Sequence, residues 1–215
     1  AALQALGKYE EAYSAYDTAT DSDASNYEAH KKKADTLSIL GKQKEAIEYY
    51  DEAIKLQPDL AFAYNNKGNA LYRVDKYEEA LECYNKAIEL QPNYADACNN
   101  KGATLAVLRK YEEAVKCYDK AIELNPCILT YTNKSEALKA LGKYTEAQQC
   151  DKEIFAIQSR DANSIYNRVD RDVISQDQQQ KLDLKLGLFV SNIKPNISNN
   201  NSVDTVPGNV QAVEP

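Results

Sequence analysis

The stretch KYEEA recurs along the chain at an almost constant interval, and this regularity constrains the fold more than any other feature. KYEEA begins at Lys8, Lys76 and Lys110, KYTEA begins at Lys143, and a variant, KQKEA, begins at Lys42. The steps between successive copies are 34, 34, 34 and 33 residues. A fixed period of this length is typical of arrays in which each repeat is one supersecondary unit stacked on the next.

Each copy contains two stretches in which apolar and small residues recur at helical spacing. In the copy at 61–94, Tyr64, Gly68 and Leu71 recur at steps of four and three, so they share one face of a first helix. A second stretch continues this pattern at Tyr77, Ala80, Tyr84, Ala87 and Leu90. Pro92 follows this stretch and ends its helix. Each copy is therefore predicted to form a helix–turn–helix unit that buries its faces by stacking on its neighbours.

The residue after the first helix also recurs. Gly41 and Gly142 occupy this position in two copies, where a left-handed conformation that ends a helix costs glycine little. Asp75 and Arg109 replace glycine in two other copies. Because Glu78 follows Asp75 by three residues, this pair also predicts a variant of the capping box at the start of the second helix.

The period and the residue pattern resemble the tetratricopeptide repeat family. Six positions of the clearest copy carry the resemblance: Gly68, Tyr77, Ala80, Tyr84, Ala87 and Pro92. The resemblance implies an all-α, right-handed superhelical solenoid over about residues 1–161. The predicted repeats are one partial copy followed by four full ones: 1–26, 27–60, 61–94, 95–127 and 128–161.

Two positions depart from the family pattern. Tyr64 and its equivalents His30, Cys98 and Tyr131 stand where the family often has tryptophan. Lys33, Lys67, Lys101 and Lys134 stand where the family usually has leucine. A lysine there can lay its aliphatic stem on the interface between repeats and raise its charge into water. We therefore expect each contact between repeats to be slightly weaker than in the family pattern.

The repeat pattern ends at about residue 161. Ile165, Val169 and Val173 lie four apart and predict a helix from about 161 to 180 that caps the last repeat. Leucines then alternate in KLDLKLGLFV, so we assign 162–191 as a capping helix with an extension. The segment 192–215 is rich in Asn, Pro and Val, has little to pack, and is predicted to be disordered.

Charge and composition argue against several classes of function. The net charge is −7 and lysines alternate with glutamates, whereas nucleic-acid binders concentrate Lys and Arg on one surface. No run of about 18 apolar residues indicates a membrane span. The five cysteines form no CxxC pair and fit a reducing compartment, so we expect a cytoplasmic protein. The chain begins within a repeat and without methionine, and we expect it to be part of a longer protein.

The sequence offers no catalytic or metal-binding motif. It contains no Gly-rich phosphate loop, no HExxH and no nucleophile paired with a base. His30 stands alone at a position that faces the repeat interior and is predicted to be a packed core residue. A single histidine with these cysteines gives no zinc set. We therefore expect no enzyme, no cofactor and no metal.

Binding residues are expected on the first helix of each repeat, which stacking places on the concave side. Asn66, Asn100 and Asn133 are equivalent and form a row of amides that can pair with both N–H and C=O of a peptide. The row resembles the asparagine ladder in the tetratricopeptide superhelix of the O-linked N-acetylglucosamine transferase. The alternative is that these asparagines are exposed repeat residues without a role. The predicted peptide-binding set is Lys31, Asn65, Asn66, Asn69, Arg73, Asn99, Asn100 and Asn133.

The family's other binding mode is the carboxylate clamp of chaperone cofactors, which holds an acidic tail with Lys, Asn and Arg side chains over three repeats. Lys31 and Asn66 match two of its five positions. The others hold Asp35, Asp96 and Asn100. Two carboxylates would repel an incoming carboxylate, so no such clamp is predicted.

These observations predict a non-catalytic protein–protein interaction scaffold that binds a peptide or partner segment in its concave groove. One alternative is a substrate-targeting module of a larger enzyme whose catalytic part lies outside this sequence. A second is a self-assembling array that stacks end to end through its partial first repeat. A third is a bacterial repeat protein delivered to a host.

Overall fold

The computed structural model describes the backbone of residues 8–168 and the side chains of residues 8–160. The chain divides into two compact units, 1–157 and 158–215, and the first of them holds the repeats. The predicted disordered tail and most of the predicted capping segment lie outside the described residues.

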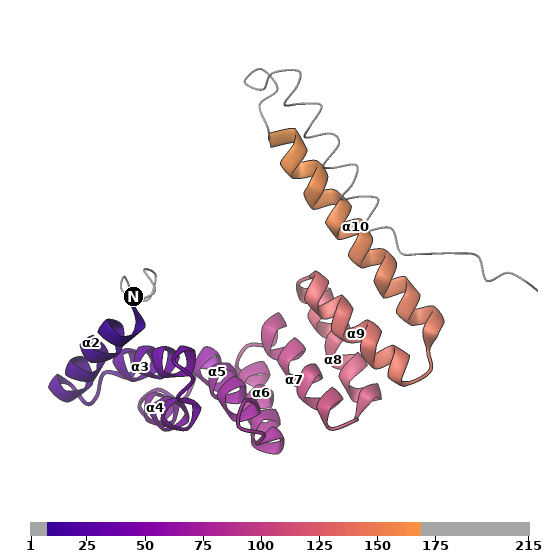
Figure 1. Ribbon diagram of the computed structural model, residues 1–215. Coiled ribbons are helices and arrows are strands. Elements are labelled where there is room, and N and C mark those ends of the chain that lie inside the picture. Colours follow the sequence, from indigo (N-terminus) through magenta and orange to yellow (C-terminus); the bar gives the residue numbers. More distant parts are fainter. Residues whose placement is uncertain (1–7, 169–215) are drawn as a thin grey trace, which may run out of the picture. The chain divides into compact units, whose positions relative to one another are not determined.

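All regular structure in 8–168 is helical, which confirms the all-α prediction (Figure 1). The first helices of the four full repeats begin at Tyr27, Ala61, Ala95 and Ile128. In chain order the helices are α2 (Tyr9–Ser22), α3 (Tyr27–Ile39), α4 (Gln43–Leu56), α5 (Ala61–Tyr72), α6 (Tyr77–Leu90), α7 (Ala95–Val107), α8 (Tyr111–Leu124), α9 (Ile128–Ala140) and α10 (Tyr144–Arg168).

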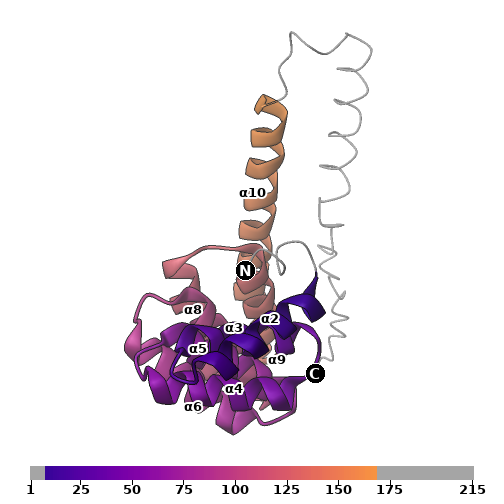
Figure 2. The same cartoon turned by 90° about the vertical axis from the view of Figure 1, so that its left-hand side faces the viewer.

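The helices of the first unit stack in sequence order. Each of α2 to α9 packs on the helix that follows or precedes it, and the first helices α3, α5, α7 and α9 also contact one another. In Figure 2 the stack is turned by 90° from the view of Figure 1. The first helices therefore form one continuous layer, which is the layer expected to carry the binding residues.

Close approach of the two helices in a repeat depends on glycine opposite tyrosine. A Cβ atom added at Gly68 would lie 2.7 Å from Cε1 of Tyr84, and one added at Gly102 would lie 2.7 Å from Cε1 of Tyr118. Both tyrosines are at most 2% exposed. The small residue that the repeat pattern predicts at this position therefore makes room for a buried aromatic ring.

In the last repeat, different residues make this contact between the two helices. Ser135 replaces the glycine and Asp151 replaces the tyrosine, and the Ser135 hydroxyl donates a 2.8 Å hydrogen bond to Asp151 Oδ1. Lys139 pairs with the other oxygen of Asp151 at 3.4 Å. A polar pair thus fills the space that an aromatic ring occupies in the two preceding repeats.

The turns confirm one prediction and correct another. Gly41 and Gly142 have φ values of 80° and 74°, and Asp75 and Arg109 adopt the same left-handed conformation with φ of 61° and 59°. The predicted capping box at Asp75 is wrong, because the N-cap of α6 is Lys76, which makes no side-chain capping bond. Asp75 instead accepts a 2.6 Å hydrogen bond from the Tyr77 hydroxyl. A residue that ends α5 in this conformation cannot also serve as the N-cap of α6.

Three of the lysines at the interfaces between repeats form ion pairs, which the sequence did not predict. Lys33, Lys67 and Lys134 pair with Asp17, Asp51 and Asp119, each of which lies on the second helix of the preceding repeat.

The ammonium group of Lys33 does not rise into water. Its side chain is only 2% exposed, and Nζ lies 4.0 Å from the ring centroid of Tyr49. Burial lowers the pKa of Lys33, but hydrogen bonds to Asp17 and Tyr49 outweigh burial and raise it overall. The lysines therefore link successive repeats through ion pairs.

Helix α10 is longer than the repeat requires. It runs without a break from Tyr144 to Arg168, so the boundary predicted at 161 falls inside a continuous helix. The second helix of the last repeat and the first part of the predicted cap therefore form one element. The rest of the predicted cap, beyond Arg168, lies outside the described residues.

Candidate functional site

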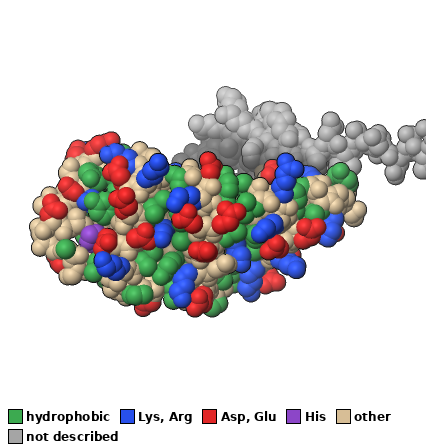
Figure 3. Space-filling view, turned by 90° about the horizontal axis from the view of Figure 1, so that it is seen from below, with side chains coloured by type: hydrophobic (Ala, Val, Ile, Leu, Met, Phe, Trp, Pro, Cys, Tyr) green, Lys and Arg blue, Asp and Glu red, His purple; other side chains and the backbone are tan. Residues whose placement is uncertain are grey.

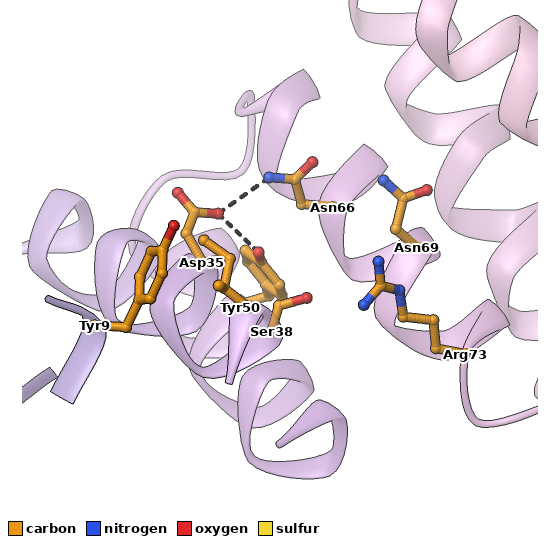
Figure 4. Close-up of a pocket in the computed structure, with 8 residues that line it drawn as sticks. Tyr9, Asp35, Ser38, Tyr50, Asn66, Asn69 and Arg73 are labelled. Carbon is orange, nitrogen blue, oxygen red and sulfur yellow. Dashed lines mark hydrogen bonds between the residues drawn. The ribbon is translucent and has the colours of Figure 1, made fainter. Parts of the chain in front are cut away.

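A cavity of about 500 Å³ opens on the layer of first helices, within the range of ligand pockets (Figure 4). Helices α3 and α5 supply most of its wall, and α2 and α4 each add one tyrosine. The lining residues are Tyr9, Asp35, Ser38, Ile39, Tyr50, Asn66, Asn69 and Arg73.

Asp35 accepts hydrogen bonds from two other residues of this cavity. Its Oδ1 atom accepts a 2.7 Å hydrogen bond from the Tyr50 hydroxyl and a 3.0 Å bond from Asn66 Nδ2 (Figure 4). Within residues 8–160, no side chain donates to its Oδ2 atom. Burial raises the pKa of Tyr50, and the charge of Asp35 raises it further, so the phenol stays protonated and keeps donating.

The next repeat builds the same arrangement without the charge. The Tyr84 hydroxyl donates a 2.8 Å hydrogen bond to Asn69 Oδ1. In both repeats the tyrosine lies 15 residues after the polar residue that accepts its hydrogen bond. From the sequence these tyrosines are expected only in the core. The 15-residue spacing between an Asp or Asn and a Tyr is the signal that would have predicted this hydrogen bond.

The asparagines of the predicted amide row each bond to the preceding repeat. Asn66 donates to Asp35, as described above, and Asn100 Nδ2 donates to Asn65 Oδ1 at 3.1 Å. Asn133 Nδ2 donates to Asn99 Oδ1 at 3.2 Å. One N–H of each amide thus fixes the orientation of that side chain. The row also links the first helices of successive repeats by hydrogen bonds.

Two predicted site residues serve as supports in this row. Asn65 is only 4% exposed, because it accepts from Asn100 and donates a 3.2 Å bond to Asn66 Oδ1. Its position on the open groove surface was therefore predicted wrongly. Asn99 is half-buried and accepts from Asn133.

The two predicted cations differ in how much they are already engaged. Lys31 forms a 2.8 Å ion pair with Glu28, and its Nζ lies 5.7 Å from the ring centroid of Phe62. Arg73 is exposed and lines the cavity, and it makes no ion pair with any residue of 8–160. Arg73 is thus the cation of the predicted set with an unengaged charge.

A second cavity, of about 400 Å³, lies farther along the same layer. Alanines and tyrosines make up most of its wall, which also includes the exposed side chain of Val107. Ala103 stands here where Asp35 and Asn69 stand in the earlier repeats, so this position offers the Tyr118 hydroxyl no acceptor. The lining residues are Tyr72, Ala103, Ala106, Val107, Tyr111, Tyr118, Asn133, Glu136, Ala137 and Ala140.

Reactive and metal-binding chemistry finds no support among the described residues. In that part of the chain no group of three or more His, Cys, Asp and Glu side chains could hold a metal. Burial raises the pKa of Cys83 to about 11 although nearby Lys67 lowers it, so the thiol form dominates. His30 is 8% exposed and packs near Tyr49, with ring centroids 6.1 Å apart.

The charge pattern of the surface and the lengths of the helices bear on the binding of nucleic acids and on membrane insertion. The face shown in Figure 3 intersperses Lys and Arg with Asp and Glu and presents no continuous basic area. Among the helices of the described residues, none is both long and apolar enough to span a bilayer.

Family models account for the central repeats. One described as "Tetratricopeptide repeat" matches residues 61–94 and 95–126, and one described as "TPR repeat" matches 34–75. The chain is a tetratricopeptide repeat protein. Its helices stack into the all-α solenoid of that family.

Solved structures of other tetratricopeptide repeat (TPR) proteins share this fold. A crystal structure of MamA is 26% identical with a TM-score of 0.71, and the match covers 75% of this chain and 95% of MamA. The first TPR of Spaghetti (RPAP3) bound to the HSP90 peptide SRMEEVD is 28% identical with a TM-score of 0.54, over 56% of this chain and 96% of that one. YrrB, titled a TPR protein with an unusual peptide-binding site, is 21% identical with a TM-score of 0.62, over 73% of this chain and 81% of YrrB. No curated protein sequence matches the chain.

Proposed function

We propose that this TPR protein is a non-catalytic interaction scaffold that binds an extended peptide or partner segment along its first helices. The observation that carries the proposal is the row of oriented amides at Asn66, Asn100 and Asn133. This row runs along a surface that also contains two cavities. Five free cysteines fit a reducing compartment, and we infer a cytoplasmic location.

The amides suit backbone recognition because their orientation is already fixed. In Asn100 and Asn133 one N–H bonds to the preceding repeat, which leaves the other N–H and the carbonyl oxygen for a ligand. A peptide strand presents both a donor and an acceptor at each residue. Side chains that are ordered before binding lose less entropy when the ligand arrives, so the row favours association.

The comparisons support a peptide ligand in general terms. The RPAP3 structure contains a bound HSP90 peptide, and YrrB is described by its peptide-binding site. Because these proteins bind peptides with the same fold, we infer the same activity for this chain.

Selection of a phage-displayed library of random nonapeptides on the purified chain tests the proposal. Asn100→Ala with Asn133→Ala removes two amides of the row, and Val107→Glu places a charge in the second cavity. Gln148→Glu is the matched control for Val107→Glu, because Gln148 is exposed on α10, the second helix of its repeat. Since the asparagines also link repeats, urea unfolding of every variant is measured beside binding.

The expected result is a set of peptides that bind the wild type and Gln148→Glu equally and bind the two groove variants at least about tenfold more weakly. All variants should remain folded under the selection conditions. Peptides that bind all four proteins alike would place binding outside the groove and overturn the proposal.

A further inference from the structure

We propose that the cavity around Asp35 selects a lysine or arginine side chain of the bound peptide. The inference rests on the groove binding proposed above and adds a charge preference at one defined repeat. Asp35 is half-buried in α3 and lies in a cavity large enough for one long side chain.

The carboxylate of Asp35 is held in one orientation. Tyr50 and Asn66 both donate to Oδ1, at 2.7 and 3.0 Å, which leaves Oδ2 as the atom without a donor among the described residues. An ammonium or guanidinium group at Oδ2 would make a charge-assisted hydrogen bond, which is stronger than a neutral one. Because the carboxylate is already oriented, little ordering is needed when the cation binds.

No neighbouring cation neutralises Asp35 within residues 8–160. Arg73 lines the same cavity, yet the two side chains form no ion pair. Lys31 is engaged by Glu28 at 2.8 Å, and the Nζ of Lys32 lies 4.0 Å from the same glutamate. The negative charge of Asp35 therefore remains available to a ligand.

The walls of the cavity suit the stem of a long basic side chain. Tyr9 and Asp35 line the same space from α2 and α3, as Figure 4 shows. Ile39 also lines it and is 55% exposed, which leaves apolar surface uncovered. Lysine and arginine bury their methylene groups on such surface while the charged end reaches a partner. A tyrosine face near the cation adds a further attraction.

Among the repeats of residues 8–160, only the one with Asp35 combines a carboxylate at this position with a tyrosine hydroxyl that orients it. Asn69 accepts from Tyr84 as Asp35 accepts from Tyr50, but an amide carries no charge. Ala103 follows in the next repeat. Glu136 in the last is exposed and lines the second cavity with Tyr118, but no tyrosine hydroxyl within residues 8–160 donates to it, and Asp151 stands where the tyrosine of its own repeat would be. The bound peptide should therefore show a basic preference at a single position.

One relative is bound to SRMEEVD, a peptide with three acidic residues and one arginine. An acidic side chain near Asp35 would meet like charge and be rejected. A direct comparison of SRMEEVD with basic peptides is therefore part of the test.

Moving the carboxylate by one repeat gives a matched set of variants. Asp35→Asn converts the site into the arrangement that Asn69 and Tyr84 already adopt, so it preserves the hydrogen bonds and removes the charge. Asn69→Asp adds a charge one repeat later. The double variant Asp35→Asn with Asn69→Asp keeps the net charge of the protein and only moves the carboxylate. Urea unfolding confirms that each variant folds.

The probes are a random nonapeptide phage library, the peptides that it yields, and SRMEEVD. We expect the wild type to enrich Lys or Arg at one peptide position, and the selected peptide to bind Asp35→Asn at least about tenfold more weakly. The double variant should shift the enriched position along the peptide. SRMEEVD should bind the wild type more weakly than Asp35→Asn. Equal enrichment of basic residues by wild type and Asp35→Asn, or no basic enrichment among groove-binding peptides, would overturn the inference and leave groove binding intact.

A small probe separates this inference from the proposed function. n-Butylguanidinium and butyrate are titrated into ¹⁵N-labelled protein while amide shifts of Ser38, Ile39 and Asn66 are followed. Shifts caused by n-butylguanidinium in the wild type, and lost in Asp35→Asn, support the cationic pocket even if no peptide is selected. Equal shifts in both proteins, or none in the wild type, overturn it.

Discussion

The two halves of the groove are built on the same backbone and carry different chemistry. In the N-terminal half, tyrosine hydroxyls bond to Asp35 and Asn69 at the cavity wall. In the C-terminal half, the corresponding position is Ala103, and no side chain within residues 8–160 accepts from the Tyr118 hydroxyl. Both halves keep the same glycine opposite a buried tyrosine at Gly68 and Gly102. The buried contacts maintain the stack, so the residues of the inner wall are free to differ and to set specificity.

The largest predicted effect tests what the halves share. Tyr84→Ala and Tyr118→Ala each remove a ring that is at most 2% exposed, which leaves a cavity opposite Gly68 or Gly102. Each substitution should cost about 3–5 kcal/mol of unfolding free energy, measured by urea denaturation followed by circular dichroism. Costs that differ by more than about 2 kcal/mol between the two variants would show that the halves do not rely on the same contact.

Alkaline pH should destabilise both halves for a common reason. Burial is the first cause of the raised pKa of Tyr84 and of Tyr118, and burial also raises the pKa of Tyr94 to about 12. The unfolded phenols lose their protons near pH 10, whereas the folded ones retain them, so the stability that neutral phenols provide below pH 10 is lost as pH rises towards 12.

This loss is measured as the free energy of unfolding in urea at pH 8, 10 and 11. Tyr84→Phe and Tyr118→Phe should each make the alkaline loss smaller, because phenylalanine has no proton to release. A loss of the same size in the wild type and in both variants would show that other groups dominate the titration.

Removal of a single hydroxyl should separate the halves. Tyr84→Phe breaks the 2.8 Å bond to Asn69 and should cost about 1 kcal/mol near neutral pH. Tyr118→Phe should cost less than about 0.5 kcal/mol, because no side chain within residues 8–160 accepts from that hydroxyl. Equal costs in the two variants, measured by urea denaturation, would contradict the contrast between a hydroxyl that has an acceptor and one that has none.

The smallest predicted effect concerns the joint between the halves. Lys67 pairs with Asp51, but Asn85 stands at the equivalent of Asp51 in the repeat that precedes Lys101. Asn85→Asp should supply the missing partner and raise the unfolding free energy by up to about 1 kcal/mol, with less gain at high salt. Asn85→Ser is the control without charge, and an equal gain in Asn85→Ser would exclude an ion pair as the cause.

Sequence reasoning succeeded where one residue type has one physical purpose. The left-handed turn at Gly41 and the small residue at Gly68 follow from steric rules that act within a repeat. It failed where a side chain has several partners within reach. Asp75 carries a capping sequence, but its backbone ends α5, and Asn65 has an exposed-looking position but bonds to Asn100.

The sequence by itself determined the repeat length, the helical register, the all-α stack and the row of equivalent asparagines, because these depend on spacing along the chain. Tertiary structure alone decided how residues more than 14 positions apart meet. It brought Asn66 to Asp35, Lys33 to Asp17 and Asn133 to Asn99. Side-chain partners across repeats depend on the rotation and separation of neighbouring units, and no local pattern encodes these quantities.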